Sequence, residues 1–285
     1  MGSGIAKNLL LNGHRLTIYN RTASRAEPFL SQGARVAASV PEACRSGLVL
    51  TMLADDAAVE SVVYGEQGLL ATLPAGGLHV SLSTISVALS ERLRADHAGE
   101  KQEFVAAPVF GRPEAAASAS LVVVAAGPAK SIERATPLFQ AMGSRLVVFG
   151  ERPSSANVVK LAGNFLLASA VESLAEAYAF ARKHGIEPQA VHELLTNTLF
   201  NAPVYKMYGE LIVTAKYEPA GFVTKLGFKD VRLVLEAAQA AAVPMPVASV
   251  VRDRLLTAIA RGNSAKDWSV LGRIADDDAG LPPVR

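Results

Sequence analysis

Two polar side chains stand in an otherwise apolar stretch near the middle of the chain. Lys160 and Asn164 lie four residues apart within segment 158–167, so on a helix they share one face. Beside a bound carbonyl compound, an ammonium can hydrogen-bond the oxygen and deliver a proton, while the amide holds the same oxygen. The structural alternative is a lysine that extends to solvent from a domain interface, with Asn164 capping a neighbouring carbonyl.

Two adjacent pairs of polar residues have similar alternatives. By spacing alone, Lys229 and Asp230 are most simply an exposed charge pair on a later helix. Ser83 and Thr84 end a predicted strand at the edge where ligands of open α/β sheets bind, although Ser-Thr is equally common at helix caps. The chain has one cysteine, Cys44, and no paired Cys/His cluster, so we predict neither an internal disulfide nor a metal site.

The first residues of the chain look like the end of a dinucleotide-binding fingerprint. Residues 1–10 match the last part of a G-x-G-x-x-G turn and its helix, with Gly2 in the place of the third glycine. We therefore expect the first strand and the first two glycines of such a unit to be missing from this sequence. After the next predicted strand, Asn20, Arg21 and Thr22 supply an amide, a guanidinium and a hydroxyl with no carboxylate. That chemistry favours the 2′-phosphate of NADP over the 2′-hydroxyl of NAD.

The periodicity of the sequence changes near residue 150. Before it, short β-rich runs alternate with amphipathic stretches, which predicts a Rossmann-type doubly wound α/β sheet, here lacking its first strand. The predicted strands are residues 15–20, 48–53, 78–82, 104–109, 121–126 and 146–149. Beyond it, Pro153, Ser154 and Ser155 predict the N-terminal cap of a long helix that runs to about Lys183 and is ended by Gly185. Further helices are predicted at about 188–196, 204–214, 223–241 and 247–261. The expected domains are a nucleotide-binding domain at 1–150 and an all-helical domain at 151–285 for substrate binding and dimerisation.

Composition excludes several classes of function. Of the 285 residues, 50% are hydrophobic and 19% charged, a balance typical of compact globular domains. The formal net charge of +2 comes from interspersed acids and bases, so no nucleic-acid partner is predicted. No uncharged apolar run reaches the roughly 18 to 20 residues that span a bilayer, and we expect a cytoplasmic protein without a membrane partner.

Taken together, these motifs resemble the β-hydroxyacid dehydrogenase family over nearly the whole chain. Residues 20–22 match the family's NADP-preferring turn, 51–53 its loop after a later strand, and 83–84 its Ser-Thr beside the nicotinamide. Residues 107–112 look like its substrate loop, which usually ends Pro-Val-Ser-Gly-Gly. Lys160 with Asn164, and Lys229 with Asp230, resemble its catalytic and closing motifs.

The resemblance implies an NADP(H)-dependent oxidoreductase that acts on a small carbonyl or hydroxy compound and forms a homodimer or higher homo-oligomer. Its implied catalytic residues are Lys160 and Asn164. The implied cofactor-binding residues are Gly2, Asn20, Arg21, Thr22, Met52, Leu53, Thr84 and Lys229. The implied substrate-binding residues are Ser83, Phe110, Gly111, Arg112 and Asp230.

The substrate loop departs from the family pattern. Phe110 replaces a serine that binds the substrate carboxylate, and Arg112 replaces the second glycine. Either Arg112 forms a displaced acid site, or Phe110 walls an apolar pocket with Arg112 in solvent. We favour the apolar pocket, and so expect that the shortest β-hydroxyacids are not preferred. An imine reductase, and a catalytically silent binding or scaffold protein, are the alternative functions.

Overall fold

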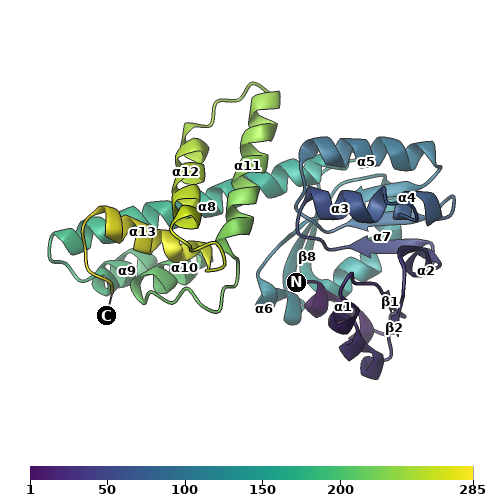
Figure 1. The fold of residues 1–285 in the computed structure, drawn as a ribbon, viewed down its shortest axis with the longest axis horizontal. Coiled ribbons are helices and arrows are strands. Elements are labelled where there is room, and N and C mark those ends of the chain that lie inside the picture. Colours follow the sequence, from purple (N-terminus) through teal and green to yellow (C-terminus); the bar gives the residue numbers. More distant parts are fainter. Residues whose placement is uncertain (285) are drawn as a thin grey trace. The chain divides into compact units, whose positions relative to one another are not determined.

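A computed structural model of the chain describes residues 1–284 and divides the protein into two compact units, Met1–Lys160 and Leu161–Arg285. The first is a Rossmann-type α/β unit and the second is helical, which confirms the predicted fold class (Figure 1). The boundary lies within one long helix, α8 (Ser154–Lys183), so the first two turns of α8 belong to the α/β unit.

The strands of the α/β unit form three hydrogen-bonded groups. The strands are β1 (Thr17–Ile18), β2 (Arg35–Val36), β3 (Leu48–Thr51), β4 (Leu78–Ser81), β5 (Glu103–Ala106), β6 (Val109–Phe110), β7 (Leu121–Ala125) and β8 (Gly143–Val148). The parallel groups are β1–β2 and β3–β4–β5, while β7 pairs with β8 in parallel and with β6 antiparallel. The sequence predicted each region except the short β2.

The predicted single strand at residues 104–109 is in fact two strands with different partners. Ala107 still donates its backbone N–H to Ser81 of β4 at 2.7 Å, as an extension of the parallel ladder. The next residue is Pro108, which has no N–H to donate, and its carbonyl accepts instead from Val124 of β7 at 3.0 Å. The chain thus changes neighbours at the proline, and Phe110 lies beside β7 rather than β4.

Successive strand residues point to opposite faces of a sheet, and apolar side chains here point to both faces. Helices cover both faces and bury these side chains. They are α1 (Gly2–Leu11), α2 (Val40–Cys44), α3 (Asp56–Val63), α4 (Leu69–Thr72), α5 (Val87–Gly99), α6 (Pro113–Ala117) and α7 (Ala129–Met142), with 3₁₀ turns at Ala23–Arg25 and Glu27–Gln32. Leu78, Val80 and Val105 pack in one core with residues of α1, α6 and α7. Phe104 and Ala106 pack in another with residues of α3, α4 and α5.

A buried chain of polar side chains runs through the second of these cores. Gln102 donates from its amide to the carbonyls of Leu70 and Leu73 at 2.9 and 2.7 Å, so its oxygen accepts from Nδ1 of His97 at 2.7 Å. Nε2 of His97 then accepts from Nδ1 of His79 at 2.9 Å. Both imidazoles are fully buried, and each is neutral in this pattern.

This row of hydrogen-bonded side chains ends at Thr51, the last residue of β3. Nε2 of His79 lies 2.9 Å from Oγ1 of Thr51, and in a neutral ring whose Nδ1 donates, Nε2 is the acceptor. The Thr51 hydroxyl therefore donates inward, toward the core. The four side chains of Thr51, His79, His97 and Gln102 tie β3, β4, α5 and the segment around α4 into one hydrogen-bonded unit.

The helical unit comprises the rest of α8 with six further short elements. These are α9 (Pro188–Asn197), α10 (Pro203–Val213), α11 (Thr224–Ala240), α12 (Pro246–Ala260), a 3₁₀ turn at Trp268–Val270 and α13 (Leu271–Asp278). Trp268 is 1% exposed and meets the rings of Tyr208 and Phe222 at 5.7 and 4.9 Å between centroids. A Cβ at Gly227 of α11 would lie 2.6 Å from the Trp268 ring, so this close approach requires glycine.

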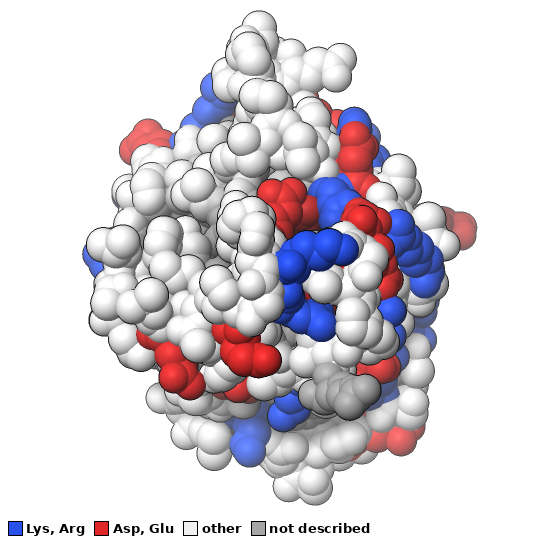
Figure 2. Space-filling view, turned by 90° about the vertical axis from the view of Figure 1, so that its left-hand side faces the viewer, with Lys and Arg blue, Asp and Glu red and all other residues white. Residues whose placement is uncertain are grey.

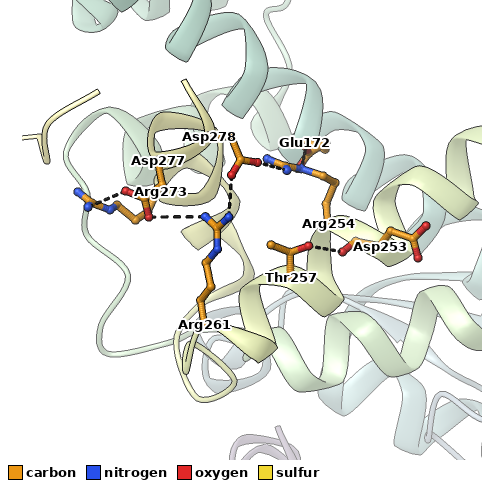
Figure 3. Close-up of polar contacts among 8 residues, drawn as sticks. All are labelled: Glu172, Asp253, Arg254, Thr257, Arg261, Arg273, Asp277 and Asp278. Carbon is orange, nitrogen blue, oxygen red and sulfur yellow. Dashed lines mark hydrogen bonds and ion pairs between the residues drawn. The ribbon is translucent and has the colours of Figure 1, made fainter. Parts of the chain in front are cut away.

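Ion pairs join three helices of this unit (Figure 3). Arg254 of α12 contacts Glu172 of α8 at 2.6 Å and Asp278 of α13 at 2.5 Å, and Arg261 of α12 contacts Asp278 at 2.8 Å. Glu172 is buried, and burial raises its pKa although the Arg254 guanidinium opposes that shift. In the face shown in Figure 2, acidic and basic side chains alternate beside a largely uncharged area, and they form no stripe of one sign there.

Helix α8 is long and apolar enough to cross a membrane by length and composition alone. Half of its most apolar window is buried inside the protein, which is also typical of a central core helix.

The buried histidines should make stability depend on pH. Burial lowers the pKa of His79 well below its ordinary value, with repulsion from His97 adding to it, and burial also lowers the pKa of His97. An unfolded histidine takes up a proton near pH 6.5, so the stability from these groups is complete above that pH and is lost as the pH falls below it. While both rings stay neutral in the folded state, the loss between pH 6.5 and 5.5 should be about 2 kcal/mol for the pair.

Urea unfolding at pH 7.5, 6.5 and 5.5 measures this effect in the wild type and in a variant with His79→Leu and His97→Leu. The variant should be less stable at pH 7.5 but should lose less stability on acidification. A wild type and a variant with the same pH slope would show that the two rings titrate normally.

Candidate active site

The start of α1 lies against the loop that follows β3. A Cβ at Gly2 would lie 3.9 Å from Cβ of Met52, and the first turn of α1 has neither an acidic residue nor a side-chain cap. A helix N-terminus of this kind offers backbone N–H groups and a partial positive charge to an anion. These features fit the pyrophosphate of a dinucleotide, and Gly2 and Met52 are the residues that would lie beside it.

Helix α1 is held against α6 by two residues that were not predicted from the sequence, Gly4 and Asn8. A Cβ at Gly4 would lie 2.8 Å from the backbone of Ala116, so only glycine permits this approach. One turn later, Asn8 is buried and donates from Nδ2 to the carbonyl of Ala116 at 2.7 Å. A small residue followed four positions later by an amide on the same helical face is the signal that would have identified them. Since α6 follows the substrate loop directly, these contacts help to fix that loop.

The polar turn after β1 presents its side chains at the surface. Oδ1 of Asn20 accepts from the backbone N–H of Thr22 at 2.9 Å, which closes the turn around Arg21. All three residues are exposed. The structure thus places a guanidinium at the end of a parallel strand, in a turn whose shape is fixed by Asn20 rather than by Arg21.

A serine hydroxyl joins the loops that follow β3 and β4. Oγ of Ser83 accepts from the backbone N–H of Leu53 at 2.8 Å, and Ser83 is fully buried. Thr84 and Leu53 are half-buried beside it. The bond keeps the two loops together at the carboxyl edge of the sheet, so Ser83 has a clear structural role at the place where ligands of such sheets bind.

The segment that resembles the family's substrate loop, residues 107–112, contains β6 and ends at Arg112. Gly111 has a φ of 137°, and a Cβ there would lie 2.7 Å from Cδ2 of Leu121, so glycine is required. Arg112 precedes α6 and its side chain is only 19% exposed, with Nε 3.9 Å from Glu114. The expectation that Arg112 lies in solvent is therefore wrong, because most of its side chain is enclosed and Nη1 of its guanidinium is buried.

Lys160 lies over the ring of Phe110, with 4.2 Å between Nζ and the ring centroid. Both residues belong to the α/β unit, and Lys160 is 8% exposed. This is the distance at which an ammonium is attracted by the negative face of an aromatic ring. The structural alternative was a lysine that extends to solvent, and the structure does not show this. Lys160 instead lies beside Phe110 of β6.

The first turns of α8 are fixed to the α/β unit. Glu91 of α5 accepts hydrogen bonds from the Ser154 hydroxyl and from Nε of Arg152, the latter at 2.5 Å. Burial works against the charge of Glu91, but these hydrogen bonds hold its pKa below the ordinary value. Ala156, one turn before Lys160, is fully buried in the core beneath α5. The position of Lys160 is consequently set by the same unit that carries the sheet.

In the helical unit, Asp230 holds two of the other expected site residues. One oxygen of its carboxylate accepts from Nδ2 of Asn164 at 2.5 Å, and the other lies 2.7 Å from Nζ of Lys229. Asn164 and Asp230 are 4% and 2% exposed, so the exposed charge pair expected from spacing alone is wrong. Both carboxylate oxygens are engaged by the protein, which makes Asp230 a residue that positions Asn164 and Lys229. A direct contact between Asp230 and substrate stays a prediction.

A nicotinamide dinucleotide fits these features better than a metal ion does. Within residues 1–284, no three His, Cys, Asp or Glu side chains are placed to hold a metal together. The α/β unit instead brings Gly2, Met52 and Leu53 to the edge of a parallel sheet, with Arg21 at the end of β1.

Comparisons with known proteins agree over almost the whole chain. Residues 1–150 match the family model described as the NAD binding domain of 6-phosphogluconate dehydrogenase. Residues 154–274 match the model described as NAD-binding of NADP-dependent 3-hydroxyisobutyrate dehydrogenase.

Individual relatives give the same result. The uncharacterized oxidoreductase YfjR of Bacillus subtilis is 42% identical over 95% of each chain. Glyoxylate/succinic semialdehyde reductase 2 of Arabidopsis thaliana is 30% identical over 95% of this chain and 75% of that protein. The structure of Mycobacterium tuberculosis 3-hydroxyisobutyrate dehydrogenase with L-serine superimposes with a TM-score of 0.86 at 25% identity, covering 96% of this chain and 95% of that one.

Removing the Asp230 carboxylate should destabilise the protein strongly. Asp230→Ala leaves the Lys229 ammonium without this counter-charge and the Asn164 amide without this acceptor, and breaking a buried pair in this way costs about 3 to 5 kcal/mol. The free energy of unfolding in urea measures the loss. On the same helix, Arg232 and Glu236 form an exposed pair at 2.9 Å, and Arg232→Ala should cost less than about 0.5 kcal/mol. Similar small losses in both variants would contradict the positioning role of Asp230.

Proposed function

The chain belongs to the β-hydroxyacid dehydrogenase family of NAD(P)-dependent oxidoreductases acting on CH–OH groups, and from that premise we propose that it transfers hydride between NADPH and a small carbonyl or hydroxy compound, with Lys160 as proton donor and acceptor. The observation that carries the proposal is the buried Lys160 ammonium over Phe110, in the unit that also forms the cofactor-binding edge. The structural alternative, a lysine that extends to solvent, does not fit the 8% exposure of Lys160.

The two parts of the chain would divide the work. We assign NADP binding to residues 1–150, and substrate binding and dimerisation to residues 151–285. A homodimer through the helical unit is supported by large apolar side chains left exposed on α8 and α12, among them Leu166 at 65%, Phe180 at 69% and Leu256 at 48%. The single buried cysteine fits a reducing setting, and we place the reaction in the cytoplasm.

Lys160 would perform the proton transfer. A bound reduced nicotinamide supplies the hydride, and the charge that develops on the carbonyl oxygen must be neutralised at the same time. The Lys160 ammonium donates a hydrogen bond to that oxygen and then the proton, and in the reverse direction the neutral amine removes the proton from the hydroxyl. We assign Asn164, one turn further along α8, to catalysis as well: one amide N–H donates to Asp230, and the second can donate to a substrate oxygen.

Arg21 would select NADPH over NADH. A guanidinium in the Asn20 turn suits a ribose that carries a 2′-phosphate. Residues 20–22 contain no carboxylate, which is the group that would bind the 2′-hydroxyl of NAD. The turn is closed by Asn20 and Thr22, so the Arg21 side chain can meet the phosphate without rearranging the backbone.

Arg21→Ala should weaken NADPH binding about tenfold to a hundredfold and leave NADH binding nearly unchanged, because a charge-assisted hydrogen bond to phosphate is worth about 1.5 to 3 kcal/mol. Dissociation constants for both cofactors measure the effect by fluorescence titration. Arg15→Ala is the matched control, since Arg15 is an exposed arginine that precedes the same strand. Equal losses for the two cofactors in Arg21→Ala would show that Arg21 does not read the phosphate.

The substrate is proposed to carry an acid group that Arg112 binds. Phe110 removes the hydroxyl that would bind a carboxylate in the usual family loop, and its ring face is occupied by the Lys160 ammonium, so it does not form a bare apolar wall. Arg112 lies two residues further, in a largely enclosed position, and a guanidinium binds a carboxylate through two parallel hydrogen bonds. Support also comes from the glyoxylate/succinic semialdehyde reductase relative, whose named substrates are acids.

Steady-state oxidation of NADPH against a panel of substrates tests this function. Glyoxylate and succinic semialdehyde should give higher kcat/KM than uncharged aldehydes of similar size. Arg112→Ala should lower kcat/KM for the acids by about tenfold or more, because a carboxylate left without its partner loses about 1 to 3 kcal/mol, and should change the uncharged aldehydes little. Best activity on bulky aldehydes or cyclic imines would contradict acid recognition by Arg112. No turnover with any member of the panel, despite NADPH binding, would indicate a silent relative.

A further inference from the structure

We propose that Phe110 is a positioning residue for Lys160: the ring of Phe110 holds the Lys160 ammonium by a cation–π contact. This inference rests on the proposed function of Lys160. It assigns the aromatic replacement a role in proton transfer, in addition to its effect on substrate choice. The contact joins two residues of the α/β unit at 4.2 Å.

The ring of Phe110 is held in place by its strand and its loop. Phe110 pairs with Val122 in the antiparallel β6–β7 ladder, and it packs against the core that contains Ile85 and Phe104. The following residue, Gly111, is fixed by its positive φ and its close approach to Leu121. The ring is therefore a rigid platform, not a mobile side chain that meets the lysine by chance.

The lysine is brought to this platform by contacts that do not involve the ring. Glu91 anchors the start of α8 through Ser154 and Arg152, and Ala156 is buried one turn before Lys160. Two independently fixed elements thus place the ammonium and the ring face opposite each other. A second cation–π contact in this unit, Arg92 over Tyr64 at 4.8 Å, differs because half of the Arg92 side chain is exposed and its guanidinium also pairs with Glu60.

An aromatic ring suits a proton donor better than a carboxylate would. The ring attracts the positive charge electrostatically but accepts no conventional hydrogen bond from the ammonium N–H groups. A carboxylate in the same place would both accept a hydrogen bond and compete for the proton. Phe110 can therefore stabilise the position of the ammonium without reducing its capacity to donate to a substrate oxygen.

A double-mutant cycle on stability tests the contact without any substrate. Phe110→Leu and Lys160→Met keep the approximate volume and remove the ring or the charge, and the unfolding equilibrium constant is measured in urea for both single variants and the double variant. The coupling should be about twofold to thirtyfold, the range found for exposed to buried cation–π pairs. Lys130 is an exposed lysine of the same unit, and Phe110→Leu with Lys130→Met should be additive. Additivity in both cycles would overturn the contact.

A series of fluorinated phenylalanines at position 110 tests the positioning role. Fluorine draws charge from the ring face while the shape stays similar, so turnover should fall stepwise from phenylalanine to monofluoro- and trifluorophenylalanine, reaching about tenfold, with the dissociation constant of NADPH unchanged. In a Lys160→Met background the fluorine series should have no effect on the rate that remains. A flat series in the wild-type background, in an enzyme that turns over, would overturn the positioning role alone. A chain that shows the stability coupling but turns over no substrate would leave the contact standing and overturn the proposed function.

Discussion

A lysine ammonium buried on an apolar helix face needs a partner that compensates for its lost hydration without consuming its proton. In this protein the ring of Phe110 provides one such contact, and several neighbouring features bring the ring and the ammonium together. At Pro108 the backbone stops pairing with β4 and begins to pair with β7, so Phe110 lies beside β7. Glu91 anchors the start of α8, which puts Lys160 above the ring. The ammonium, the ring and the sheet edge then belong to one compact unit.

The second constraint is close backbone approach at that edge. Gly4 lets α1 touch the backbone of α6, and Asn8 satisfies the Ala116 carbonyl that this approach buries. Ser83 joins the loops after β3 and β4, because its hydroxyl oxygen accepts a hydrogen bond from the Leu53 N–H. These contacts hold the loops rigid, and rigid loops are needed because a small displacement of a reacting group lowers the rate of transfer sharply. In the helical unit, Asp230 plays a comparable part for Asn164 and Lys229.

The sequence was sufficient where local patterns decide the structure. The change of periodicity near residue 150 predicted a Rossmann-type unit followed by helices, and α8 begins and ends where its caps indicated. It was insufficient where a residue's role depends on distant partners. Nothing near His79 in the chain indicates that it meets His97 and Thr51, and the short β2 carries too little β-rich sequence to be recognised. The burial of Asp230 and of the Arg112 side chain is likewise set by packing. Spacing alone favoured solvent for Asp230, and the altered substrate loop favoured it for Arg112.

The most direct test of this account is the rate of a single turnover in Lys160→Ala. With enzyme in excess over NADPH and a saturating good substrate, the loss of NADPH absorbance reports the chemical step without product release. General acid catalysis is commonly worth about a hundredfold to ten-thousandfold, so the variant should be slower on that scale, while its affinity for NADPH and its folded structure stay as in the wild type. A single-turnover rate close to the wild-type rate would contradict the account, because the ammonium over Phe110 would then be a structural contact and the proton would come from another group.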